Sequence, residues 1–202
     1  MTFLEHVAYA LLWLSFGVLH SALADRRLKE PVQHVIGSRY RVAYNIVATV
    51  HVGAVYFIGR FLLASDSLDF SLPQYWPTVS TALQVLGFAI IIVALSHYDL
   101  GRFVGITQIQ RQEPDVDGEA AAEQLHISGL HRWVRHPLYL GVFLVLWSRV
   151  AGEFELATAV WASLYVVIGA KLEEGRLIGI YGDAYTIYRQ KVPMFFPVKR
   201  FR

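Results

Sequence analysis

The sequence contains no cysteine among its 202 residues, and charged residues make up only 17% of it. Without cysteine the chain has no disulfide framework, no thiolate metal site, no iron–sulfur cluster and no cysteine nucleophile. Hydrophobic residues make up 55%, which excludes an intrinsically disordered chain. The 18 Lys and Arg against 16 Asp and Glu leave a net charge of +2. That balance predicts no nucleic-acid partner.

Glycine-rich nucleotide-binding motifs are also absent. No Gly-x-Gly-x-x-Gly follows a predicted strand, and no Gly-x-x-x-x-Gly-Lys occurs, so neither a Rossmann fold nor a phosphate-binding loop is expected. His126, His131 and His136 recur every five residues and therefore do not share one helix face. The sequence accordingly predicts no metal site.

The hydrophobic residues gather in five stretches, at residues 2–24, 40–64, 76–96, 138–151 and 154–170. A stretch of about 20 apolar residues crosses a ~30 Å hydrocarbon core as a helix. The first stretch lacks a basic leader and a cleavage site, so we interpret it as a retained membrane helix. The last two are short for a span and lie close enough for a tight helical hairpin. We therefore expect an all-α integral membrane protein with about five transmembrane helices and a cytosolic C-terminal helix.

The connections between these stretches alternate in basic residues. Segments 25–41, 97–137 and 171–202 contain several Lys and Arg, whereas segment 65–77 contains none. Because basic loops stay on the cytosolic side, we expect the N-terminus outside and the C-terminus in the cytosol, in a bacterial inner membrane. The lipid bilayer is thus one partner.

We expect a single domain over residues 1–202, with a three-helix part at 1–96. The second part, 97–202, would contain the cofactor site, the helical hairpin and the C-terminal helix. The sequence does not indicate whether the protein is a monomer or an oligomer.

A polar segment directly precedes the fourth stretch. Arg135 and His136 stand before Pro137, a residue suited to the first turn of a helix. A helix N-terminus is partly positive, so these side chains beside it would form a site for a carboxylate or a phosphate. The alternative is an anchor that reaches the lipid headgroups. These residues alone leave both interpretations open.

Two adjacent carboxylates, Glu173 and Glu174, follow the fifth stretch. Adjacent helix positions point about 100° apart, so we do not expect both to serve one partner. One of them would face inward and hold a cationic group, because acidic groups at membrane depth are costly unless paired. The alternative is a solvated pair with Lys171 and Arg176.

Three tyrosines continue the C-terminal segment. Tyr181, Tyr185 and Tyr188 are spaced at i, i+4 and i+7, which predicts one helix face at the membrane interface. Val192-Pro193 and Phe196-Pro197 would end this helix and lay the tail along the membrane.

Two blocks of sequence resemble the isoprenylcysteine carboxyl methyltransferase superfamily of integral membrane methyltransferases. The first is Gly129-Leu-His-Arg-Trp-Val-Arg-His-Pro-Leu-Tyr-Leu-Gly141. The second joins Glu173-Glu-Gly-Arg-Leu177 to Tyr181-Gly-Asp-Ala-Tyr-Thr-Ile-Tyr188 and Val192-Pro-Met-Phe-Phe-Pro197. His131 stands where the superfamily usually has tyrosine.

A narrower resemblance covers other segments. Phe16-Gly-Val-Leu-His-Ser-Ala-Leu-Ala24 and Asp99-Leu-Gly-Arg-Phe-Val-Gly-Ile-Thr-Gln108 are similar to the methanethiol S-methyltransferase and NnrU-like branch. Gly169 occupies the position where the prenyl-cysteine enzymes place an arginine that serves the substrate. This speaks against a prenylated carboxylate as the acceptor.

The resemblance implies S-adenosyl-L-methionine as cofactor and a small or lipophilic acceptor as substrate, in particular a thiol such as methanethiol. The cofactor-binding residues that it implies are Gln108, Gln124, Leu125, His126, His131, Arg135, His136, Tyr139 and Glu173. Of these, Arg135 or His136 would take the carboxylate of the cofactor and Glu173 its ammonium. Tyr139 would donate a hydrogen bond or face the sulfonium. A thiol must also lose its proton, and the choice between Glu174 and a histidine stays open.

Other functions compete with this one. Methyl esterification of an isoprenylcysteine carboxylate or methylation of a lipid amine would use the same cofactor. A membrane reductase of the sterol-reductase type shares the C-terminal tyrosines, but its NADPH phosphates would want cations where Glu173 and Glu174 stand. A non-enzymatic haem protein would use His20, His51 or His97.

Overall fold

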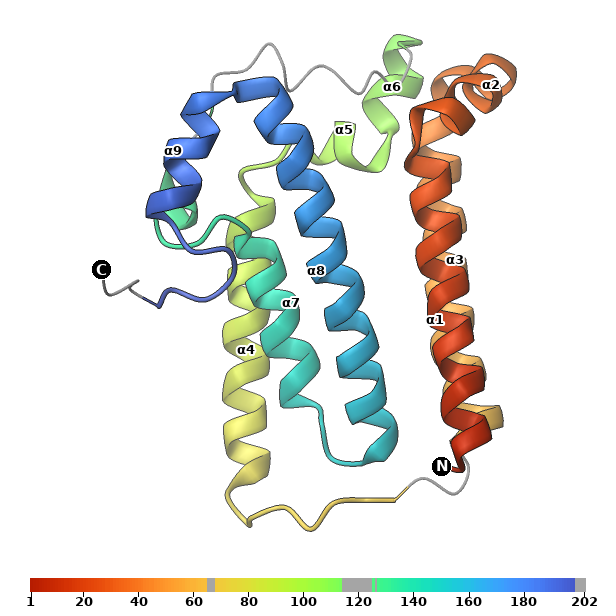
Figure 1. The fold of residues 1–202 in the computed structure, drawn as a ribbon, viewed down its shortest axis with the longest axis vertical. Coiled ribbons are helices and arrows are strands. Elements are labelled where there is room, and N and C mark those ends of the chain that lie inside the picture. The colour runs from red at the N-terminus through yellow and green to blue at the C-terminus, as the bar shows by residue number, and fades with distance from the viewer. Residues whose placement is uncertain (65–67, 114–124, 126, 199–202) are drawn as a thin grey trace. The chain divides into compact units, whose positions relative to one another are not determined.

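The computed structural model describes residues 1–64, 68–113, 125 and 127–198, which form two compact units (Figure 1). Unit 1 comprises the described residues of Met1–Ser71, Tyr98–Val116 and Val150–Ala162. Unit 2 comprises those of Leu72–His97, Asp117–Arg149 and Ser163–Arg202. Apart from an isolated bridge between Asp69 and Gly152, the elements found in these residues are helices.

Unit 1 is built on two long helices that pack together, α1 (Phe3–Ala24) and α3 (Tyr40–Ile58), and α3 continues into a π-helical turn, η2 (Gly59–Leu63). Thr2 caps α1, and Glu5 completes a capping box, which satisfies orphan amides of the first turn. Tyr9, Trp13 and Phe16 of α1 are buried. Their spacing of four and three residues places all three on one helix face.

Unit 1 also contains several short helices and the start of a long one. They are α2 (Arg26–Ile36), the 3-10 turn η1 (Gly37–Arg39), α5 (Leu100–Val104), α6 (Ile106–Arg111) and the start of α8 (Glu153–Tyr181). Asn45 Nδ2 donates to the carbonyls of Phe103 and Val104 at 3.1 and 3.2 Å. Gly105, with φ 97°, joins α5 to α6, and a Cβ there would lie 2.8 Å from the backbone nitrogen of Val42. Only glycine fits this junction.

Unit 2 contains α4 (Trp76–Leu95), the 3-10 turn η4 (Gly129–Arg132), α7 (Pro137–Ser148), the rest of α8 and α9 (Asp183–Lys191). Helices α4 and α7 run side by side (Figure 1). Gly87 and Gly141 let their backbones approach, because a Cβ on either would lie 2.7–2.8 Å from the carbonyl oxygen of the other. Small residues serve this purpose in membrane helices.

Helix α8 is longer than the sequence indicates. Its stretch was expected to end at residue 170, but the helix continues to Tyr181, so both glutamates lie within it. Gly182, with φ 56°, then ends α8 and starts α9. Tyr181 therefore does not share a helix with Tyr185 and Tyr188, and the prediction of one face for all three is wrong. A glycine at this φ breaks the helical path.

Four helical segments are long and apolar enough to cross a membrane, namely Phe3–Ala24, Arg26–Phe61, Trp76–Leu95 and Glu153–Tyr181. Helix α7 has 12 residues, which gives about 18 Å against a ~30 Å core. The all-helical class is confirmed in the described part of the chain. The count of five crossings and the cytosolic C-terminal helix stay predictions.

Candidate functional site

Unit 2 buries three titratable side chains against one another. Arg135 and His136 precede α7, Glu174 lies near the end of α8, and the three residues are 8, 7 and 5% exposed. Glu174 Oε1 accepts from Arg135 Nε at 2.6 Å and lies 3.1 Å from His136 Nε2. Buried charges persist only when paired and hydrogen-bonded. The two blocks of the resemblance therefore meet in space.

The guanidinium of Arg135 has further partners. Its Nη1 donates to the carbonyl of Arg189 at 3.0 Å and to that of Val192 at 2.5 Å. These bonds tie the end of α9 to α7 and α8, a use that suits the rigid fork of donors on arginine. The geometry favours a positioning role for Arg135, and its direct contact with a cofactor carboxylate stays a prediction.

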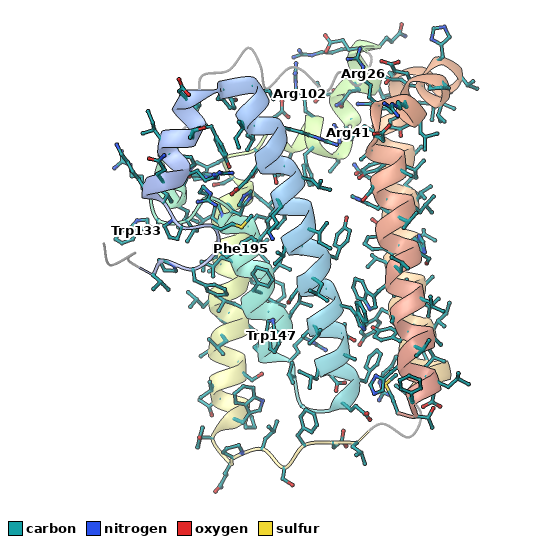
Figure 2. The ribbon with its side chains drawn as sticks, in the orientation of Figure 1. Arg26, Arg41, Arg102, Trp133, Trp147 and Phe195 are labelled. Carbon is teal, nitrogen blue, oxygen red and sulfur yellow. The ribbon has the colours of Figure 1, made fainter. Side chains whose placement is uncertain are left out.

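The chain after α9 covers the start of α7. The carbonyls of Pro193 and Met194 accept from the backbone N–H groups of Arg135 and His136 at 2.9 and 3.1 Å. The Phe195 ring lies 5.8 Å from the His136 ring and 5.0 Å from that of Phe143, measured between centroids (Figure 2). The tail was expected to lie along the membrane. Its first residues satisfy the two backbone donors that directly precede α7, and the course of the tail along the membrane stays a prediction.

The tyrosines of α9 support the same group from a second side. Tyr185 and Tyr188 are 2 and 6% exposed, so the expected aromatic stripe at a membrane interface is wrong for these two. Tyr188 donates to the carbonyl of His131 at 2.7 Å, and His131 Nδ1 lies 3.2 Å from the carbonyl of Arg135. Burial raises the pKa of Tyr188 to about 12, with Arg135 opposing the rise and Glu174 adding to it. Burial, helped by the charge of Glu174, likewise raises the pKa of Tyr185. Both hydroxyls are therefore protonated at neutral pH.

Glu173 is the open member of the group. Its side chain is 45% exposed, and its Oε2 lies 3.6 Å from His136 Nδ1. Tyr139 donates to the same oxygen at 3.4 Å, and the Tyr139 ring stacks on that of His136 at 5.4 Å and 18°. The expectation that two adjacent glutamates cannot serve one partner is wrong here. The imidazole has a nitrogen on each side of the ring, so it reaches Glu174 with one nitrogen and Glu173 with the other.

The other residues implied by the resemblance are not all brought together. Gln108 lies in α6 of unit 1, where Nε2 donates to the carbonyl of Arg102 at 3.1 Å. Its Oε1 is buried and has no hydrogen-bond partner within the part of the chain that the structure describes. Leu125 is half-buried. Gln124 and His126 fall outside the described residues. The cofactor contacts of all four stay predictions.

The histidines considered for haem have other neighbours. His20 Nε2 lies 2.6 Å from the Tyr44 hydroxyl, and His51 Nε2 lies 3.1 Å from Ser15 Oγ. The Phe16 ring contacts both imidazoles, at 5.5 and 5.6 Å between centroids. These contacts suit polar links between α1 and α3.

Comparison with known proteins supports the class of membrane methyltransferases. Methanethiol S-methyltransferase 1 of Bradyrhizobium diazoefficiens is 31% identical over 94% of this chain and 66% of that protein. Methanethiol S-methyltransferase of Crocosphaera subtropica is 32% identical over 90% of this chain and 71% of its own length. Protein-S-isoprenylcysteine O-methyltransferase of Schizosaccharomyces pombe is 32% identical, but over only 35% of this chain and 31% of that protein. These relatives confirm the resemblance.

The chain belongs to the DUF1295 family, described as a protein of unknown function, which matches residues 9–180. It spans about two thirds of the length of the Bradyrhizobium relative. No solved structure matches it.

Proposed function

We propose that this chain is a membrane methyltransferase that uses S-adenosyl-L-methionine to methylate a small thiol, namely methanethiol. The observation that carries the proposal is the buried group of Arg135, His136 and Glu174 with the half-exposed Glu173 beside it. The relatives named methanethiol S-methyltransferases support the acceptor. Gly169, which offers no side chain where a prenyl-cysteine enzyme would need a cation, supports a small acceptor as well.

The donor set of this group fits the amino-acid end of the cofactor. Glu173 retains exposed carboxylate surface and can accept from an ammonium. The first turn of α7 offers backbone amides and a partial positive charge to a carboxylate. The Tyr139 ring offers a π face for a sulfonium. The bound cofactor supplies an electrophilic methyl group there.

Arg135 and Glu174 act as positioning residues in this proposal. Glu174 bonds to Arg135 and His136 through the same oxygen, and it thereby fixes the imidazole against Glu173. A thiol acceptor must give up its proton to a base. Glu174 is buried and already engaged by two partners, which disfavours it as that base. Alignment of donor and acceptor supplies much of the rate in such transfers.

We also propose how the chain crosses the membrane. We place the N-terminus outside and the C-terminus in the cytosol of a bacterial inner membrane, with α7 covering part of the fourth crossing and α8 forming the fifth. Non-helical backbone at membrane depth is tolerated where protein satisfies it. The bonds from Arg135 and His136 to the carbonyls of Pro193 and Met194 meet that condition. We also propose a single functional domain over residues 1–202.

A labelling experiment tests the proposal. Purified full-length protein in lipid nanodiscs is incubated with methyl-labelled S-adenosyl-L-methionine and one acceptor at a time. The acceptors are methanethiol, a prenyl-cysteine and phosphatidylethanolamine. We expect label in dimethyl sulfide alone. Glu155→Gln, a half-buried glutamate at the other end of α8, is the matched control for Glu173→Gln and should retain turnover. Label in another acceptor, or in none, would contradict the proposal.

A further inference from the structure

One end of unit 1 gathers basic side chains. Segments 25–41 and 98–113 contain these Lys and Arg residues: Arg26, Arg27, Lys29, Arg39, Arg41, Arg102 and Arg111. Their acids are fewer, namely Asp25, Glu30, Asp99 and Glu113. Asp25 and Asp99 cap the N-termini of α2 and α5. Glu30 pairs with Arg26, and Asp99 also pairs with Arg102 at 3.7 Å. Figure 2 shows Arg26, Arg41 and Arg102 at this same end of the unit. We call the six arginines among these residues the arginine end.

Helix α2, which lies at this end of unit 1, has a stripe of exposed apolar side chains. Leu28, Val32 and Val35 are 52, 41 and 85% exposed, and their spacing of four and three residues puts them in one stripe. Lys29, one position on from Leu28, is 4% exposed and marks the side that packs on the unit. Arg27 is exposed beside the stripe. A short helix with an exposed apolar stripe and flanking cations is the pattern of a helix that lies in a membrane interface.

The connections of α2 place it at the membrane boundary. It begins two residues after α1 ends and leads through η1 directly into α3, and both of those helices are long enough to span. The contact of Asn45 with the α5–α6 junction holds those helices against the start of α3. Phe103 and Ile106 there are 51 and 52% exposed. Apolar and basic side chains thus share one boundary.

We propose that the arginine end binds the phosphate groups of anionic phospholipids in the bilayer, with the stripe of α2 inserted at the acyl boundary. Guanidinium groups bind phosphate oxygens bidentately, and the charge of the surface is complementary to an anionic leaflet. The opposite end of unit 1 has four acids, Glu5, Asp69, Glu153 and Glu155, against the cations Arg60 and the N-terminal amine, so the excess of positive charge belongs to one leaflet. This inference is independent of the methyl acceptor.

The test compares lipid selectivity between variants of the full chain. Protein is reconstituted in nanodiscs of phosphatidylcholine with phosphatidylglycerol, and native mass spectrometry measures the ratio of the two lipids that it retains. We expect enrichment of phosphatidylglycerol that weakens as salt rises. Because one Lys or Arg near an anionic surface is worth roughly fivefold in affinity, Arg27→Gln with Arg39→Gln should lower the enrichment about tenfold or more.

Matched variants keep the test decisive. Arg132→Gln with Arg149→Gln removes two exposed arginines of unit 2 and should leave the enrichment nearly unchanged. Val35→Asp should lower it by disturbing the stripe while circular dichroism shows an intact helical fold. The proposal is overturned if the Arg27/Arg39 variant retains the enrichment or if the unit 2 variant loses as much. It is equally overturned if inorganic phosphate displaces the bound lipid more effectively than sodium chloride does at the same ionic strength, because the site would then take free phosphate.

Discussion

The two units have similar long helices, but they place their polar side chains differently. In unit 1, α1 and α3 pack through buried aromatic rings, the Tyr44–His20 pair is partly buried and the Ser15–His51 pair is exposed. The buried polar side chains described in this unit, Lys29 and Gln108, lie on separate helices, α2 and α6. In unit 2, an arginine, a histidine and a glutamate are buried together. Apolar packing is sufficient to hold helices, whereas a buried ion pair is costly to desolvate. The difference therefore supports the proposal that the group in unit 2 belongs to the functional site.

The largest effect is expected from replacing Glu174, which tests the buried group of unit 2 directly. Glu174→Ala leaves the buried guanidinium of Arg135 without its carboxylate, and losing one partner of a buried pair costs about 3–5 kcal/mol. Thermal or denaturant unfolding in detergent measures the loss. Glu173→Ala, the half-exposed neighbour, should cost about 1 kcal/mol or less. Equal losses of unfolding free energy for the two variants would contradict the prediction that the buried Glu174 contributes more stability than the half-exposed Glu173.

Tyr188 tests the support that α9 gives to the site. Tyr188→Phe removes the hydroxyl that bonds to the carbonyl of His131 and leaves the ring, so we expect a loss of about 1 kcal/mol. Tyr75→Phe, an exposed tyrosine in the same unit, serves as control. An unchanged midpoint of unfolding for Tyr188→Phe would show that this hydrogen bond does not stabilise the fold.

Tyr44 gives the corresponding test in unit 1, where we expect the smallest effect. Tyr44→Phe removes the hydroxyl facing His20, and hydrogen bonds between membrane helices average about 0.6 kcal/mol. Tyr56→Phe, on the same helix and 40% exposed, controls for loss of a hydroxyl at that surface. A loss larger than that of Glu174→Ala would reverse the comparison between the units.

Much of the fold follows from hydrophobic length alone. The stretches at 2–24 and 76–96 correspond closely to α1 and α4, because about 20 apolar residues define a helix of that length. The stretch ending at 170 was too short, since Glu173 and Glu174 interrupt the apolar run without interrupting the helix. The burial of Glu174 depends on partners 38 and 39 residues earlier in the chain, and no local sequence pattern indicates such partners.

Four of the residues that the sequence predicted for the site lie in one group, but the way they pair was not predicted. Arg135, His136, Tyr139 and Glu173 do lie together, as the two blocks implied. The inward glutamate that pairs with Arg135 is Glu174, and sequence position cannot show which of two neighbours faces inward. The tail from Pro193 to Phe195 was missed because main-chain carbonyls act there, and these carry no signature in the sequence.

Binding of the cofactor tests the central claim most directly. Isothermal titration of S-adenosyl-L-methionine into the purified protein should show binding, and Glu173→Gln should weaken it by at least ~1.5 kcal/mol, the scale of a charged hydrogen bond, which is about tenfold in Kd. Unfolding measured in parallel should show that the variant stays folded. A folded Glu173→Gln variant that binds the cofactor as tightly as the unaltered protein would contradict the site.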